Sequence, residues 1–125
     1  MNSTPIPLSV VVATKSGLMY HSLLAFLSVL PNVQIVGLVR DIELVLTATH
    51  QNRPNVLILD TNLSESHVPG LIQRLKAEIP TLNCVVLANN VRQQSASLSA
   101  GANHALLKGF LDGQLTQAVL ATKPN

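Results

Sequence analysis

Asp60 is the residue whose type and position point most clearly to chemistry. It follows the apolar residues 56–59, which have mostly branched side chains and come soon after Pro54. A short apolar run of this kind is typical of a strand buried on both faces, in a parallel sheet covered by helices. Open α/β sheets place their sites at the carboxyl ends of strands. Asp60 is therefore predicted to lie at such a site, or else simply to open a loop, where Asp is common.

The other reactive side chains do not form a catalytic pattern. Lys15 and Ser16 resemble the end of a phosphate-binding loop, but the upstream glycines that would cradle phosphate are absent. The sequence has no Gly-x-Gly-x-x-Gly motif and no Cys or His spacing suited to zinc. Each histidine is on a separate predicted element and is expected at the surface or at an edge; the four are His21, His50, His67 and His104. We therefore expect that the protein is not an enzyme.

The elements that position Asp60 alternate between strand-like and helix-like segments. Strands are predicted over about 8–13, 34–38, 56–60, 83–88 and 105–107. Helices are predicted over about 18–30 and 41–51 with Asp41 as an N-cap, from near Pro69, up to Ala100 before Gly101, and from Lys108-Gly109 onward. This alternation with short breaks predicts an α/β fold with right-handed crossovers.

Length and composition predict one globular domain over residues 1–125, with an ordered core of about 7–121. Hydrophobic residues make up 47% of the chain and charged residues only 11%. Eight Lys and Arg against six Asp and Glu give a net charge of +2, and the basic residues are spread along the chain. With two Phe, one Tyr and no Trp, the chain lacks both the basic footprint and the stacking platform of a nucleic-acid binder. Direct nucleic-acid binding is not expected.

The protein is expected to be cytoplasmic and not bound to a membrane. The first eight residues lack the basic and apolar regions of a signal peptide, and no apolar run reaches the length of a membrane span. The single cysteine, Cys84, lies in an apolar run and cannot form an internal disulfide. A buried thiol in a reducing compartment is the simplest interpretation.

Three segments resemble the receiver domain of bacterial two-component response regulators, especially the branch with a C-terminal helix-turn-helix domain. Residues 54–60 (PNVLILD) stand where the family has its phospho-accepting aspartate, which gives that place to Asp60. Residues 100–109 (AGANHALLKG) look like its Gly-Ala segment with the conserved lysine, here Lys108, and residues 31–37 resemble its second-strand entry. The resemblance implies a flavodoxin-like, doubly wound, five-stranded parallel sheet of order 2-1-3-4-5, with helices on both faces.

The resemblance also shows where this chain departs from the family. Thr14 and Lys15 occupy the positions of the acidic pair that helps to hold Mg²⁺. Ala88 replaces the hydroxyl residue that ends the fourth strand, and Ala105 replaces the aromatic switch residue on the fifth. Mg²⁺ needs oxygen ligands, usually including carboxylates, and a lysine ammonium would repel it. We therefore expect no bound metal and no cofactor.

In the implied fold, Asp60, Lys15 and Lys108 converge at one edge of the sheet. An ion pair between Asp60 and one lysine is expected to replace the metal-bridged cluster, unless Lys15 extends into solvent. Such a pair would fix one conformation and uncouple the domain from phosphorylation. We therefore interpret the chain as a pseudo-receiver, a protein-interaction module in bacterial signal transduction or transcriptional regulation that works without Mg²⁺-dependent phosphorylation.

Three alternatives remain open from the sequence. The first is a functional phospho-acceptor receiver that uses Asp60 and Lys108. The second is a sensor of a small anionic ligand, bound by the first helix N-terminus and by Lys15, Lys108, Thr14, Ser16 and Asn89. The third is that the chain is one domain of a longer DNA-binding regulator. The partner and the regulated pathway are not encoded in any pattern we can identify.

The family resemblance places a common docking surface on the fourth helix, fifth strand and fifth helix. Residues 93–105 contain no Lys, Arg, Asp or Glu, and Gln114, Thr116 and Gln117 on the last predicted helix are uncharged. Depletion of charge is typical of an interface core, although it also fits a merely low-charge surface. We predict that a protein partner or a second copy docks on this face, with Ser97 and Gln117 exposed on it.

Overall fold

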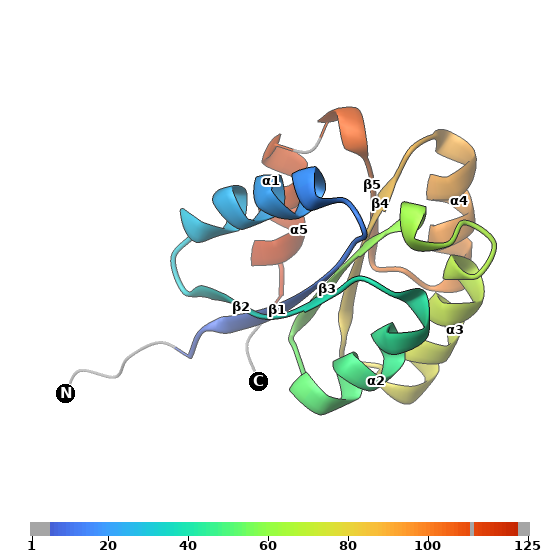
Figure 1. Ribbon diagram of the computed structural model, residues 1–125, viewed down its shortest axis with the longest axis horizontal. Coiled ribbons are helices and arrows are strands. Elements are labelled where there is room, and N and C mark those ends of the chain that lie inside the picture. Colours follow the sequence, from blue (N-terminus) through green and yellow to red (C-terminus); the bar gives the residue numbers. More distant parts are fainter. Residues whose placement is uncertain (1–5, 111, 123–125) are drawn as a thin grey trace.

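Five parallel strands form the central sheet of the computed structural model, which describes residues 6–110 and 112–122 (Figure 1). The strands are β1 (Leu8–Ala13), β2 (Val33–Val39), β3 (Val56–Asp60), β4 (Asn83–Ala88) and β5 (His104–Leu107). Their order across the sheet is β2-β1-β3-β4-β5, and every neighbouring pair is parallel. The doubly wound α/β sheet predicted from the sequence is thereby confirmed.

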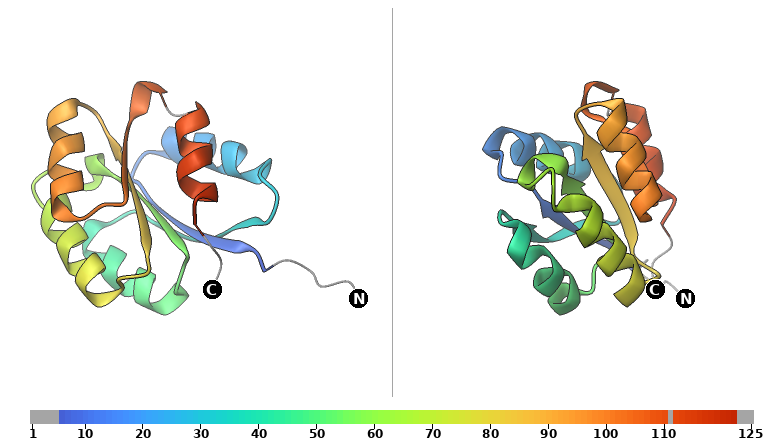
Figure 2. Two further views of the ribbon diagram at one scale, coloured as in Figure 1. Left: turned by 180° about the vertical axis from the view of Figure 1, so that it is seen from behind. Right: turned by 90° about the vertical axis from the view of Figure 1, so that its right-hand side faces the viewer.

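Helices cover both faces of this sheet (Figure 2). They are α1 (Gly17–Ser28), α2 (Ile42–Asn52), α3 (Val68–Glu78), α4 (Val91–Ala100) and α5 (Asp112–Leu120). Side chains of α1 and α5 pack on one face, and those of α2, α3 and α4 pack on the other. No helix among the described residues is long and apolar enough to span a membrane.

The strands are apolar on both sides because both of their faces are buried. Successive side chains of a strand point to opposite faces, so Val10 and Val12 pack against the α1–α5 layer and Val11 against the other. All residues of β3 and β4 are buried, as expected for central strands of a covered parallel sheet. The buried Cys84 belongs to β4, and desolvation raises the pKa of its thiol to about 12.

Capping residues mark the ends of several helices. The Asp41 side chain accepts a hydrogen bond from the Glu43 N–H and caps α2, as predicted. Gly101 ends α4 with a φ of 114°, a left-handed conformation that glycine adopts readily. The first helix ends at Ser28, two residues before the predicted Leu30.

Two predictions about the second half of the chain are wrong. The last helix does not open at Lys108, because Lys108–Phe110 forms a 3₁₀ turn and α5 begins at Asp112. Ser97 is not on the surface, since it is only 1% exposed and lines a cavity beside α3. Its helix has no strong apolar pattern that could reveal which side packs inward.

Ile72 tests the packing of α3 against the sheet. Its side chain is fully buried in the core cluster, so Ile72→Ala should lower the free energy of unfolding by about 2–5 kcal/mol. The neighbouring Gln73 is exposed, so Gln73→Ala should change the free energy of unfolding by less than about 0.5 kcal/mol. Urea unfolding of both variants measures the difference, and equal effects would contradict the described orientation of α3.

Candidate functional site

Three strand ends bring Thr14, Asp60 and Lys108 together. Thr14 directly follows β1, Asp60 is the last residue of β3, and Lys108 directly follows β5. The carboxyl ends of parallel strands meet at one edge of the sheet, so residues 46 and 48 positions apart become neighbours. Thr14 and Asp60 are each 1% exposed. The site is thus a polar cluster almost sealed from water.

Both oxygens of the Asp60 carboxylate are already hydrogen-bonded. Oδ1 accepts from the Lys108 ammonium at 2.6 Å and from the Asn62 backbone N–H at 2.9 Å. Oδ2 accepts from the Thr14 hydroxyl at 2.8 Å. The Lys108 side chain is 18% exposed against 2% for Asp60, so this ion pair is largely desolvated. Such a pair is costly to break, because the remaining charge stays buried without its partner.

Lys15 does not take part in this cluster. Its side chain is exposed, and among the described residues the ion pair of Asp60 is with Lys108 alone. The predicted ion pair between Asp60 and one lysine is found with Lys108, and Lys15 extends into solvent, which is the alternative left open by the sequence. Adjacent side chains at a strand end point in opposite directions. Because the Thr14 side chain points toward Asp60, the Lys15 side chain points away from Asp60 into solvent.

The groups named for an anion site are mostly engaged elsewhere. Lys108 and Thr14 bind Asp60, and the Ser16 hydroxyl caps α1 by accepting from the Met19 N–H at 3.1 Å. The Asn89 amide donates to the Asn62 side-chain oxygen at 2.7 Å. Of that set, Lys15 is the cation that forms no ion pair with the residues the structure describes.

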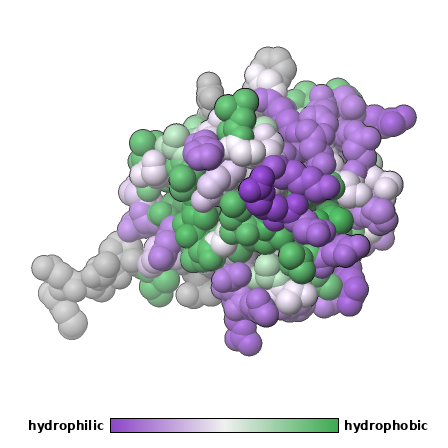
Figure 3. Space-filling view, in the orientation of Figure 1, coloured by the Kyte–Doolittle hydropathy of each residue, from purple (hydrophilic) through white to green (hydrophobic). Residues whose placement is uncertain are grey.

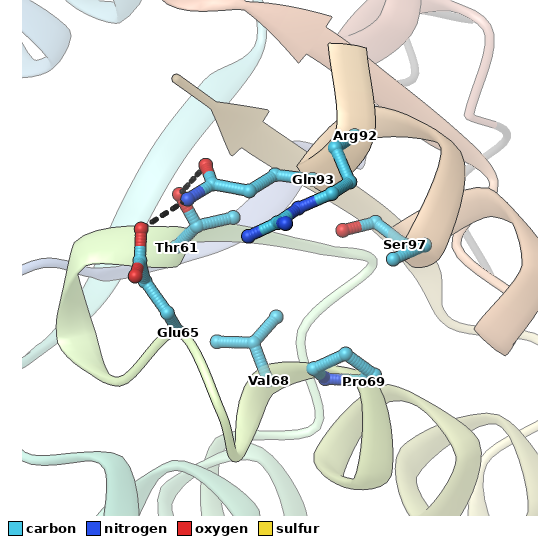
Figure 4. A pocket seen from close by; sticks show the side chains of 8 residues that line it. Thr61, Glu65, Val68, Pro69, Arg92, Gln93 and Ser97 are labelled. Atoms are coloured by element: carbon cyan, nitrogen blue, oxygen red, sulfur yellow. Dashed lines mark hydrogen bonds between the residues drawn. The ribbon is translucent and has the colours of Figure 1, made fainter. Parts of the chain in front are cut away.

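Gln93 ties together the two loops beside the site (Figure 4). Its side-chain oxygen accepts from the Thr61 hydroxyl at 3.0 Å and from the Asn89 N–H at 2.8 Å. Its amide nitrogen donates to the Glu65 carboxylate. The sequence analysis missed this residue, because a glutamine gives no signal until the loops after β3 and β4 are known to be adjacent. The start of α4 is thereby fastened to the segment that follows Asp60.

A cavity of about 130 Å³ lies beyond Gln93, between α4 and the start of α3 (Figure 4). Its walls combine the apolar Val68 and Pro69 with the polar Glu65 and Ser97. Arg92 extends over this cavity in the figure and forms no ion pair with a described residue.

The two remaining site positions predicted from the sequence are buried alanines. Ala88 ends β4 and is fully buried, and Ala105 on β5 is 7% exposed. Neither side chain can hydrogen-bond to a group bound at Asp60. Among the described residues no cluster of three or more His, Cys, Asp or Glu side chains is placed to hold a metal ion. The histidines are exposed apart from the half-buried His104, as predicted.

The fold and this edge site define a receiver-type α/β domain. The family model of the response regulator receiver domain matches residues 10–120, and the chain belongs to this family. It is thus a receiver domain of the two-component response regulator type.

Solved structures of response regulators have the same fold. The signal receiver domain of NarL from Mycobacterium tuberculosis is 22% identical with a TM-score of 0.78, and the alignment covers 94% of each chain. A LuxR-family regulator from Aurantimonas sp. SI85-9A1 is 12% identical with a TM-score of 0.82, covering 92% of this chain and 84% of that one. RcsB from Salmonella typhimurium is 24% identical with a TM-score of 0.79, covering 91% of this chain and 60% of that one. The comparison with curated proteins gives no match.

The different roles of the two lysines can be tested by stability measurements. Lys108→Met should lower the free energy of unfolding by about 3–5 kcal/mol, because it leaves the Asp60 carboxylate buried without a cation. Lys15→Met removes an exposed lysine and should change the free energy of unfolding by less than about 0.5 kcal/mol. Adding Asp60→Asn to Lys108→Met should restore part of the loss, since no buried charge then remains. Chemical denaturation measures all three, and similar losses for the two lysine variants would contradict the geometry.

Proposed function

We propose that this receiver is a pseudo-receiver, which regulates through protein contacts without Mg²⁺-dependent phosphorylation of Asp60. The observation that carries the proposal is that Asp60 is the single carboxylate of its cluster, with the Thr14 hydroxyl hydrogen-bonded to it where the family has an acid. In this arrangement a fixed ammonium supplies the positive charge that a metal ion would otherwise bring. The aspartate then serves to hold the domain in one state.

The residues present do not fit the Mg²⁺ ion that the receiver family implies. Mg²⁺ is held in octahedral geometry by oxygen ligands that usually include one or two carboxylates. Here Asp60 supplies the single carboxylate of the cluster, while Thr14 offers a hydroxyl whose proton is donated to Asp60. The Lys108 ammonium, 2.6 Å from Oδ1, stands where the family keeps a lysine, so the misfit lies in the missing acids at Thr14 and Lys15. No phosphotransfer step is therefore assigned to this site.

The surroundings of Asp60 also favour a single state. The side chains of Ala88 and Ala105 have no polar group that could contact a phosphoryl group on Asp60. Gln93 holds the start of α4 against the loop after β3. A domain held in this way can act as a constant docking module. We place its action in the bacterial cytoplasm, in signal transduction or transcriptional regulation, with no catalytic activity of its own.

The face of α4, β5 and α5 is the docking surface that we propose for a protein partner or a second copy. Gln94 on α4 donates from its side chain to the Ala105 carbonyl of β5 at 2.8 Å, so this side of α4 borders the strand. Leu98 lies one turn later on the same side and is 48% exposed. Gln117 on α5 is also exposed. An exposed leucine among uncharged residues fits an interface core.

Restoring the missing acids should restore the metal site. In an NMR titration with millimolar Mg²⁺, the wild-type amides of residues 14, 15, 60 and 62 should not shift saturably. Thr14→Asp combined with Lys15→Asp adds a second carboxylate next to Asp60 and replaces the neighbouring exposed lysine by an acid, and these amides should then shift with Mg²⁺. The same two proteins, incubated with acetyl phosphate and Mg²⁺, should differ in Phos-tag gels, with Asp60→Asn as the negative control. Mg²⁺-dependent phosphorylation of the wild type would identify a working phospho-acceptor receiver instead.

Charge placed on the docking face tests the surface separately. Leu98→Glu combined with Gln117→Lys should weaken any assembly formed through this face, as measured by analytical ultracentrifugation. Binding of the wild type should depend little on salt, because few charges take part. Assemblies that sediment identically for the wild type and the variant would exclude this face.

A further inference from the structure

The two outer strands of the sheet differ in how their free edges are protected. Backbone N–H and C=O groups along an unpaired edge are a template for another strand. On β5 the strand has four residues, and Gln94 satisfies the Ala105 carbonyl. On β2 the strand has seven residues and pairs with β1 alone, and no described side chain hydrogen-bonds to its backbone. The β2 edge is thus the longer and the less protected of the two.

The β2 edge also lacks charged residues. Its sequence, VQIVGLV, contains no Lys, Arg, Asp, Glu or Pro, which are the residues that natural edge strands use against pairing. The first charged residues after the strand, Arg40 and Asp41, make hydrogen bonds away from the β2 edge. Arg40 donates to the Lys15 carbonyl at 3.1 Å, and Asp41 caps α2. One protective feature remains, a bulge at Val36, which lies between the paired residues Ile35 and Gly37.

Apolar side chains surround this edge. Figure 3 shows hydrophobic residues gathered across the middle of the face, over β2 and between α1 and α2. Leucines of all three elements are exposed: Leu38 of β2 and Leu24 of α1 are each 38% exposed, and Leu44 of α2 is 57% exposed. Since α1 and α2 pack on opposite faces of the sheet, a strand added at β2 would be flanked by apolar surface on both sides.

We propose that the β2 edge pairs with β2 of a second copy of this chain, antiparallel and about a two-fold axis. The two five-stranded sheets then form one continuous sheet of ten strands. In such a pairing the strand faces its own sequence in reverse, so a charged residue on the axis would face its own copy, and any charge on the strand would be carried by both strands. A strand without charges has no such repulsion, which favours self-pairing.

The size of the contact fits a dimer only if the helices take part. At about 3.3 Å per residue, seven residues give a strand contact of about 23 Å. Stable interfaces bury about 1,200–2,000 Å² in total, so the flanks of α1 and α2 must add to the strand pairing. The exposed Leu24 and Leu44 supply apolar surface for this. Because β2 and β5 are opposite edges of the sheet, the dimer leaves the α4, β5 and α5 face free.

Matched pairs of lysine substitutions test the proposal. Gln34→Lys with Leu38→Lys adds two positive charges at exposed positions of β2, so both strands of the proposed pairing carry like charges. Gln73→Lys with Ala77→Lys adds the same charge at two exposed positions of α3. In sedimentation velocity over a concentration series, the wild type and the α3 variant should dimerise equally. The β2 variant should dimerise at least about tenfold more weakly, because like charges oppose the contact. Circular dichroism should show that both variants remain folded.

A second measurement needs no substitution. Amide hydrogen exchange of the wild type should slow within residues 33–39 as the protein concentration rises, while the amides of β5 should be unaffected. A wild type that is monomeric at all concentrations would overturn the proposal, as would a dimer that survives the β2 substitutions. A dimer lost with Leu98→Glu and Gln117→Lys but not with the β2 pair would likewise overturn it, and would support the α4, β5 and α5 face instead. None of these results depends on whether Asp60 can be phosphorylated.

Discussion

A buried carboxylate must be neutralised, and this requirement shapes the carboxyl edge of the sheet. Asp60 is removed from water by the strands on either side of β3 and is compensated by one ammonium, one hydroxyl and one backbone N–H. Lys108 can reach it because a 3₁₀ turn follows β5 and delays the start of α5. Thr14 can reach it because β1 pairs directly with β3. Three separate chain segments are therefore held in register by one charged group.

The hydrogen bonds beyond Asp60 extend this constraint into the loops. Asn62 is linked to Asn89, and Thr61 and Glu65 are linked to Gln93. These contacts join the segments after β3 and β4, which lie side by side at the edge of the sheet. A conformational change at the start of α4 would have to break several of them together. The proposal of a module with one fixed surface rests on this arrangement and on the buried alanines at positions 88 and 105.

The edges of the sheet show how one architecture can offer two kinds of surface. At β5 a short strand, a glutamine that caps a carbonyl and neighbouring helices produce a face suited to side-chain docking. At β2 a long uncharged strand leaves its backbone available, and the cation that follows is directed to the loop after β1. Main-chain pairing gives affinity with little dependence on side-chain identity. The two proposed contacts lie at opposite edges of the sheet and do not overlap.

The pattern of apolar runs and the family resemblance were enough to predict the fold and the position of Asp60 at the edge of the sheet. Apolar runs such as residues 56–59 are typical of buried strands, and the acid that ends this run lies at the carboxyl edge of the sheet. The sequence did not determine which lysine pairs with Asp60, because both follow strands, and only the direction of each side chain separates Lys108 from Lys15. Nor did it reveal Gln93 or the burial of Ser97, since small and polar residues carry no pattern of their own. Those features depend on how loops and helices distant in the chain pack together, and tertiary structure alone decides that.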